Sequence, residues 1–250
     1  MPNGGLNSHL FGKREEILSW DTRYKIALGL ASAILYLHEE WDQCVLHRDI
    51  KASNIMLDGD FNVKLGDFGL ARVMSHKLDS HKTGLAGTFG YMAPEYVMTG
   101  CASKESDMYS FGIVLLEIVT GRKSLERGRE DESDDDSESD EKSLVERVWE
   151  LYGKKELLSL GVDEKLGDDF NMEEAECLLV LGLWCGHPDK SSRPSIKQAI
   201  QVMKLESPLP VNLPLKRPVA TYYNSTSSSS PLSVNSSRAS ITFSSKEVGR

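Results

Sequence analysis

The sequence of 250 residues predicts an α+β fold that is mainly helical. Apolar residues recur at helical spacing in several segments, and one clear pair of strands interrupts them. With 40% hydrophobic residues, the chain is long enough to bury one sizeable core. We therefore expect one folded domain over residues 1–206, followed by a Ser-rich disordered tail over residues 207–250.

The first long helix is expected to begin near Trp20. Ser19 can cap its N-terminus, and apolar residues between positions 27 and 37 recur every three or four residues on one face. Further helices are expected over residues 107–119, 144–158, 173–185 and 195–205.

The strand pair lies within residues 55–65. Two short apolar stretches are joined there by Asp58-Gly59, and an Asp-Gly turn between apolar stretches is typical of a β-hairpin. Asp49 and Asp67 then lie on the loops that flank this hairpin. Two carboxylates are thus predicted to flank one small structural unit.

Three motifs follow one another around this hairpin. Residues 47–54 read His-Arg-Asp-Ile-Lys-Ala-Ser-Asn, residues 67–69 read Asp-Phe-Gly, and residues 93–95 read Ala-Pro-Glu. In this order they resemble the catalytic loop, the metal-binding turn and the closing motif of protein kinases. Each tripeptide alone occurs by chance, but their common order and spacing make chance a poor explanation. The Gly-rich loop and the Val-Ala-Ile-Lys strand that precede these motifs in kinases are absent from the sequence.

Residues 18–73 and 86–123 together resemble the kinase domain of plant receptor-like serine/threonine kinases, most closely the legume (L-type) lectin class. The resemblance covers about residues 1–206, and residues 1–6 resemble the end of the hinge between the two kinase lobes. It implies the C-terminal lobe of a protein kinase, with a short hairpin at the catalytic loop and with the small lobe missing.

The resemblance assigns chemistry to four residues. Asp49 would accept the proton of the attacking hydroxyl, and Lys51 would place its ammonium near the transferred phosphate. A lysine at this position favours a serine/threonine kinase over a tyrosine kinase. Asn54 and Asp67 would bind Mg²⁺, which prefers oxygen ligands.

ATP is the second expected cofactor, together with Mg²⁺. Met56 would form the floor beneath the adenine, and Met1 falls where a hinge amide normally meets the base. The lid, the phosphate-holding lysine and its orienting glutamate belong to the small lobe in this family. Only half of a nucleotide cleft is therefore expected.

Regulation is expected in the activation segment, residues 67–95. The guanidinium group of Arg48 can bind a phosphate on this segment through two parallel hydrogen bonds. Thr83 matches a position commonly phosphorylated in the family. Thr88 is either a second phosphorylation site or a hydroxyl that contacts Asp49 and the neighbouring lysine directly.

Three further residues are expected to be structural. Glu95 and Arg193 match a buried ion pair that ties the activation segment to the lower helices of the family. Asp107 either caps its own helix or, as the resemblance implies, holds backbone amides of the catalytic loop.

The net charge of −9 comes from one segment. Residues 130–141 hold nine of the 38 acidic residues and no basic ones, so acidic and basic residues balance elsewhere. Such a run predicts a solvated, disordered loop, placed here at residues 128–142. Its serines, Ser133, Ser137 and Ser139, are alternatively targets of an acid-directed kinase. Nothing in the charge pattern indicates nucleic acid as a partner.

The sequence shows no signal peptide, and its longest apolar run, residues 113–119, is too short to cross a bilayer. Its four cysteines have no paired or metal-binding spacing. We expect the chain as given to be cytoplasmic. In the parent family the kinase domain lies on the cytoplasmic side of the plasma membrane.

Two functional hypotheses remain. In the first, the chain is a serine/threonine kinase of receptor signalling, represented by a truncated product or an incomplete gene model, and its partners are proteins with Ser or Thr acceptors. In the second, it is a catalytically inactive lobe that binds substrates or partner kinases as an interaction module.

Overall fold

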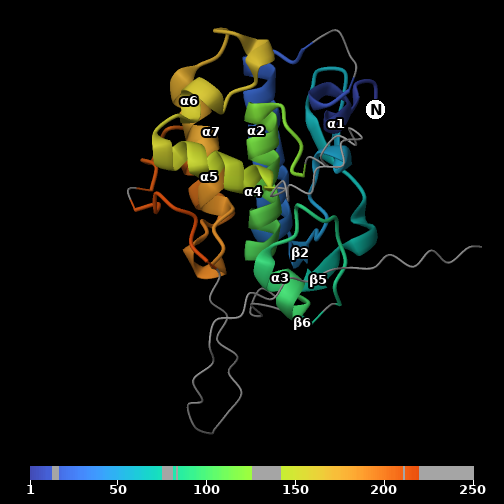
Figure 1. The fold of residues 1–250 in the computed structure, drawn as a ribbon. Coiled ribbons are helices and arrows are strands. Elements are labelled where there is room, and N and C mark those ends of the chain that lie inside the picture. The colour runs from blue at the N-terminus through green and yellow to red at the C-terminus, as the bar shows by residue number, and fades with distance from the viewer. Residues whose placement is uncertain (13–16, 75–80, 83, 126–141, 211, 220–250) are drawn as a thin grey trace, which may run out of the picture.

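Two long helices, α2 and α4, run side by side through the centre of the computed structural model, with α7 packed beside them (Figure 1). The structure describes residues 1–12, 17–74, 81–82, 84–125, 142–210 and 212–219. The helices are α1 Leu6–Leu10, α2 Trp20–Leu35, α3 Pro94–Thr99, α4 Lys104–Thr120, α5 Leu144–Lys154, α6 Leu157–Leu160, α7 Met172–Cys185 and α8 Ile196–Met203. The strands are β1 Gly4–Gly5, β2 Cys44–Leu46, β3 Ile55–Leu57, β4 Val63–Leu65, β5 Arg72–Met74, β6 His81–Lys82 and β7 Cys101–Ala102.

Helix α2 begins where the sequence predicted. The Ser19 hydroxyl accepts a hydrogen bond from the Thr22 amide, and the helix starts at Trp20. Its buried face includes Ile26, Leu30 and other apolar residues at helical spacing. The helix continues into a π-helical turn, Tyr36–Glu40, which leads the chain toward β2 and the catalytic loop.

Helix α4 is the centre of the core. Every residue from Ser106 to Thr120 is buried, so the helix packs against neighbours on all sides. It begins three residues before the predicted start because Ser103 and Ser106 bond each other's backbone amides in a reciprocal cap. Gly112 lets α7 come close, since a side chain there would lie 2.5 Å from Cys185 Cβ.

The helix predicted over residues 144–158 is divided in the structure. Helix α5 ends at Lys154, and Lys155 adopts a left-handed conformation with φ 62°. The Lys155 amide bonds back to carbonyls of the last turn, which closes the helix. The short helix α6 then starts in a new direction at Leu157.

The predicted hairpin is present as β3 and β4, with Ile55 opposite Leu65. Its turn is closed by Asp58, whose carboxylate accepts the amides of Asp60 and Asn62. Strand β1 pairs with the other edge of β3, β2 pairs with β5, and β6 pairs with β7, all antiparallel. These short strands lie on one side of the helices and hold the catalytic and activation loops.

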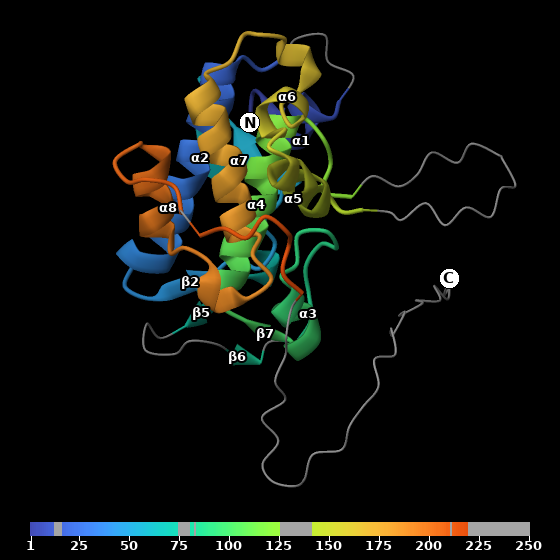
Figure 2. The same cartoon turned by 60° about the vertical axis from the view of Figure 1, so that its left-hand side comes forward.

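The segment after α8 differs from the expectation of a disordered tail from residue 207. Residues 212–219, the C-terminal strap, run past α5 toward α3 (Figure 2). Leu213 is only 7% exposed, and the Trp149 indole donates a hydrogen bond of 2.8 Å to the Pro214 carbonyl. The sequence explains this order, because prolines at positions 208, 210, 214 and 218 restrict the unfolded chain and alternate with apolar residues.

Two predicted disordered regions lie largely outside the described residues. These are the acidic segment, of which residues 126–141 are not described, and residues 220–250 of the tail. Thr83 also lies outside the described residues. Among the helices that the structure describes, none is long and apolar enough to cross a membrane.

Candidate active site

Asp107 fixes the backbone of the catalytic loop. Its carboxylate accepts the amides of His47 and Arg48, each at 2.8 Å, and lies 3.0 Å from His38 Nε2. Asp107 sits on the first turns of α4, but Ser103 caps that helix. The structure therefore has the arrangement that the resemblance implied, in which Asp107 bonds the loop instead of its own helix.

Asp49 lies at the centre of a hydrogen-bonded cluster. Lys51 Nζ is 2.7 Å from Oδ2, Thr88 Oγ1 donates to Oδ1 at 2.7 Å, and Asn54 Nδ2 donates to Oδ2 at 3.1 Å. Burial of the carboxyl raises its pKa, but the hydrogen bonds from Lys51, Thr88 and Asn54 outweigh burial and hold the pKa of Asp49 below its ordinary value. Asp49 is therefore an ionised acceptor at neutral pH.

Thr88 contacts both predicted catalytic residues. Its hydroxyl donates to Asp49 and accepts from Lys51 Nζ at 2.8 Å. This is the direct contact that the sequence left open beside phosphorylation. Gly87 permits it, because φ is +137° there and a side chain would lie 3.0 Å from the Arg48 carbonyl oxygen.

The two predicted metal ligands lie together at the open end of the hairpin, Asn54 before β3 and Asp67 after β4. The Gly66 amide bonds the Asn54 carbonyl at 2.9 Å, which places Asp67 next to Asn54. The side-chain nitrogen Nδ2 of Asn54 donates hydrogen bonds to the carbonyl and the carboxylate of Asp49. The side-chain oxygen of Asn54 can therefore bind a cation. Asp67 is exposed in a left-handed turn with φ 59°. One amide oxygen and one carboxylate form a donor set that fits Mg²⁺, which takes its remaining ligands from water and phosphate.

The residues predicted to meet the nucleotide lie along β3. Met56 is half-buried and stands opposite Gly5 of β1. The Asn3 amide also bonds the Leu57 carbonyl at 3.3 Å, so the N-terminal residues follow the same strand. Met1 is 56% exposed, and its carbonyl accepts the Gly4 amide in a turn.

Arg48 was expected to bind a phosphate. In the structure its guanidinium donates to the Tyr96 hydroxyl, to the Leu70 carbonyl and to the Gly84 carbonyl, at distances from 2.7 to 3.2 Å. The contact with Tyr96 was not predicted from the sequence. Its position directly after the Ala-Pro-Glu motif was the available signal, but the reach of its hydroxyl depends on the tertiary fold.

Comparison with known proteins identifies the family of the chain. The protein kinase domain family matches residues 1–203. The chain belongs to the protein kinase family. It is 78% identical over its whole length to the L-type lectin-domain containing receptor kinase IX.2 of Arabidopsis thaliana, and 61% identical to receptor kinase IX.1 of the same plant. It is 45% identical, over 84% of its length, to the L-type lectin-domain containing receptor kinase SIT1 of Oryza sativa subsp. japonica.

The resemblance to plant L-type lectin receptor kinases is thereby confirmed. The chain spans 37% of the length of the two Arabidopsis relatives and 30% of the rice relative. What those whole proteins do is therefore carried to this chain only as a proposal.

A buried ion pair anchors the activation segment of this kinase domain. Both oxygens of Glu95 lie 2.6 Å from the guanidinium nitrogens of Arg193. Arg193 also donates to the carbonyls of Glu105 and His187, and its guanidinium lies over the Tyr109 ring. The ion pair implied by the resemblance is present, and it joins α3 to the loop before α8.

The burial of Glu117 was not predicted from the sequence. Glu117 of α4 is fully buried, and its Oε1 accepts from the Tyr91 hydroxyl at 2.7 Å and from the Ser124 amide at 2.9 Å. Its Oε2 has no hydrogen-bond partner among the described residues. Burial raises the pKa of Glu117 to about 7, against the hydrogen bonds from Tyr91 and Ser124. Glu117 thus ties the loop after Thr88 to the central helix.

Proposed function

We propose that this chain is the substrate- and metal-binding lobe of a receptor-like serine/threonine kinase, which transfers the γ-phosphate of ATP to a protein hydroxyl. The observation that carries this proposal is the contact of a hydroxyl, that of Thr88, with both Asp49 and Lys51. In phosphoryl transfer to Ser or Thr, a carboxylate accepts the proton of the acceptor hydroxyl, and an ammonium beside it can stabilise charge on the transferred phosphoryl group.

In the proposed reaction, Asp49 orients the acceptor hydroxyl and takes its proton. A bond forms between the acceptor oxygen and the γ-phosphorus, and the bond from that phosphorus to the β,γ-bridging oxygen breaks. Lys51 stabilises the negative charge on the transferred phosphoryl group. The lowered pKa of Asp49 keeps this residue ionised, so it can accept the proton as the new bond forms.

Asn54 and Asp67 would hold Mg²⁺. The chemistry that the ion would supply there is neutralisation of the negative charge on the phosphate oxygens. Met56, with the N-terminal residues beside it on β1, would form the lower surface for the adenine. The Gly-rich lid, the phosphate-holding lysine and its glutamate have no counterpart in residues 1–250 and would come from a small lobe.

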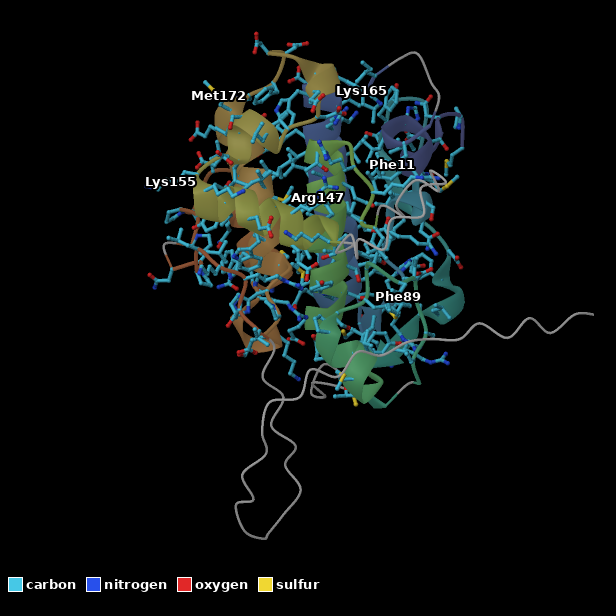
Figure 3. The ribbon with its side chains drawn as sticks, viewed as in Figure 1. Phe11, Phe89, Arg147, Lys155, Lys165 and Met172 are labelled. Carbon is cyan, nitrogen blue, oxygen red and sulfur yellow. The ribbon has the colours of Figure 1, made fainter. Side chains whose placement is uncertain are left out.

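The proposed substrates are proteins with Ser or Thr acceptors. Phe89, next to Thr88, is 65% exposed on the loop that leads into α3 (Figure 3) and offers an apolar surface to a bound peptide. By analogy with the receptor kinase relatives, we place the working domain on the cytoplasmic side of the plasma membrane. Partner kinases are further proposed binding partners.

The test is a chimera with the small lobe of the relative that is 78% identical placed ahead of Met1. The chimera should transfer radiolabelled phosphate from ATP to a Ser- or Thr-containing protein, and Asp49→Asn should abolish the transfer. Asp60→Asn is the matched control, because Asp60 is exposed on the hairpin turn. A folded chimera without activity, or one that tolerates Asp49→Asn, contradicts the proposal.

A non-catalytic interaction module is the second candidate. Exposed apolar side chains favour it, since Met1 and Phe68 are both about half-exposed beside the proposed nucleotide surface. Such a module should bind its partner equally well as the wild-type chain and as Asp49→Asn. Binding that needs Asp49 would contradict this candidate.

A further inference from the structure

We infer that Tyr96 is a positioning residue, whose hydroxyl fixes Arg48 and thereby the catalytic loop against residues 84–86 of the activation segment. The inference rests on the proposed function for its link to catalysis. The catalytic loop at Arg48 and residues 84–86 lie far apart in the sequence and meet at the hydroxyl oxygen of Tyr96.

Tyr96 is placed by the first turn of α3. Ala93 is the N-cap and Pro94 the first helical residue, so the following side chains are set by a regular helix start. The Tyr96 side chain is only 2% exposed. A buried phenol must find partners for its hydroxyl, and the partners it finds come from outside its own helix.

The Tyr96 hydroxyl lies within hydrogen-bonding distance of five atoms. Arg48 Nη2 and Nε donate to it at 2.7 and 3.2 Å, and the Ala86 amide donates at 3.1 Å. The carbonyls of Gly84 and Ala86 lie at 3.0 and 2.9 Å. A phenol has one proton, so it donates to one of these carbonyls at a time while it accepts from Arg48 and Ala86.

Because Arg48 is charged and buried, its guanidinium depends on the Tyr96 hydroxyl as a hydrogen-bond acceptor. Arg48 is buried, and within the described part of the chain it forms an ion pair with no carboxylate. The Leu70 and Gly84 carbonyls and the Tyr96 hydroxyl are the oxygens that receive its hydrogen bonds there. Among the described residues, Nε donates to the Tyr96 hydroxyl alone, so loss of the hydroxyl leaves this buried charged donor without a partner there.

Arg48 transmits this restraint to Asp49. Its backbone has φ 71°, a left-handed conformation that a non-glycine residue adopts only where the surroundings hold it. Asp107 holds the Arg48 amide, and Tyr96 holds the guanidinium at the other end of the residue. Asp49 follows directly, so both anchors set the direction in which its carboxylate points.

The first test is amide hydrogen exchange in the full 250-residue chain, comparing wild type with Tyr96→Phe. The variant keeps the ring and removes the oxygen. We expect about tenfold faster exchange at the Ala86 amide and at the amides of Arg48 and Asp49, because one hydrogen bond to a charged group is lost. Tyr152→Phe, which removes a hydroxyl bonded to the strap, is the matched control and should leave these amides unchanged.

The second test is kinetic and uses the chimera described above. Tyr96→Phe should lower kcat about tenfold and leave the KM for ATP unchanged, since the hydroxyl acts on the catalytic loop and not on the nucleotide surface. The chimera and its Tyr96→Phe variant are compared at a temperature at which thermal unfolding curves show that both are folded.

The two tests separate the inference from the proposed function. An inactive chimera refutes the proposed function, and hydrogen exchange then decides whether Tyr96 fixes the catalytic loop. Unchanged exchange at Ala86 and Arg48 overturns the inference whatever the activity. Faster exchange with an unchanged kcat in an active chimera shows that Tyr96 has no positioning role.

Discussion

Asp107 Oδ1 lies 2.8 Å from the backbone nitrogen of Arg48, although 59 residues separate the two in the sequence. The other oxygen of the same carboxylate accepts the His47 amide. Two consecutive amides of the catalytic loop are therefore held by one side chain of the central helix. The precision of the candidate site depends on this link between a loop and the most buried helix of the domain.

The first prediction is that Asp107→Asn destabilises the domain. An asparagine keeps one acceptor oxygen, but its NH₂ group would face the second amide, which then loses its bond in a buried site. We expect a loss of about 3 kcal/mol in the free energy of unfolding, measured with urea. Asp21→Asn, on the exposed first turn of α2, is the control and should change stability little.

The second prediction concerns Glu95 and Arg193. Glu95→Gln leaves Arg193 buried without a countercharge, which should cost about 3–5 kcal/mol of unfolding free energy. The exposed pair Arg122 and Glu164, 3.8 Å apart, gives a matched control, because Glu164→Gln should cost less than about 1 kcal/mol. Equal effects in the two pairs would show that burial does not determine the strength of this contact.

The third prediction is a pH dependence that comes from Glu117. Burial raises its pKa from the ordinary value of 4.5 to about 7, so the folded state disfavours the charged form. Its contribution is fully present below 4.5 and is lost as the pH rises through about 7. Tyr91 and Ser124 bond the carboxyl, and Lys123 is the cation that acts on it.

Glu117→Gln removes this titration. Relative to the variant, wild type should lose on the order of 3 kcal/mol of unfolding free energy between about pH 5 and about pH 8. Urea unfolding of both proteins across this range measures the difference. A constant difference between them would mean that Glu117 does not titrate in the folded protein.

The fourth prediction is that the C-terminal strap is part of the folded domain. Leu213→Ala removes a buried side chain and should cost about 2–4 kcal/mol of unfolding free energy. Leu215→Ala is the control in the same strap, since Leu215 is largely exposed. A chain that ends at residue 219 should match the full chain in stability, whereas one that ends at residue 206 should be less stable. Equal stability of the two truncated chains would refute a structural role for the strap.

The fifth prediction is weak binding of Mg-ATP by the 250-residue chain. Two oxygen ligands leave most of the coordination sphere of the ion to water and phosphate, and an open cleft weakens charge interactions. Titration calorimetry should show an affinity far below that of the chimera, and Asp67→Asn should lower it further while Asp60→Asn should not. Equal affinity for the isolated chain and the chimera contradicts the expectation.

Helix capping and turn formation depend on residues close together in the sequence, so part of the fold could be predicted from the sequence. Ser19 can cap only a helix that starts beside it, and Asp58-Gly59 favours a turn in any context, so α2 and the β3–β4 hairpin were correctly predicted. The division of α5 from α6 was missed, because the left-handed conformation of Lys155 has no signal as clear as a glycine.

The candidate site was only partly predictable, because local sequence does not determine contacts between distant segments. The motifs and the family resemblance predicted Asp49, Lys51, Asn54 and Asp67 as site residues, and their catalytic and metal-binding roles stay predictions. The sequence left two roles open for Asp107 and two for Thr88. The packing of α4 decided the first, and the loop at Gly87 brings Thr88 into contact with Asp49, while phosphorylation of Thr88 stays a prediction.

The sequence by itself therefore determined which chemical groups this kinase domain has, where α2 begins and where the β3–β4 hairpin lies. The tertiary structure alone decided the contacts of Tyr96, the burial of Glu117 and the packing of the C-terminal strap on α5. The physical reason is distance along the chain. Capping, turns and periodicity act over a few residues. The bonds from Glu117 to Tyr91, from Tyr96 to Arg48 and from the strap to Trp149 instead join residues 26 to 65 positions apart and exist only after the core has packed.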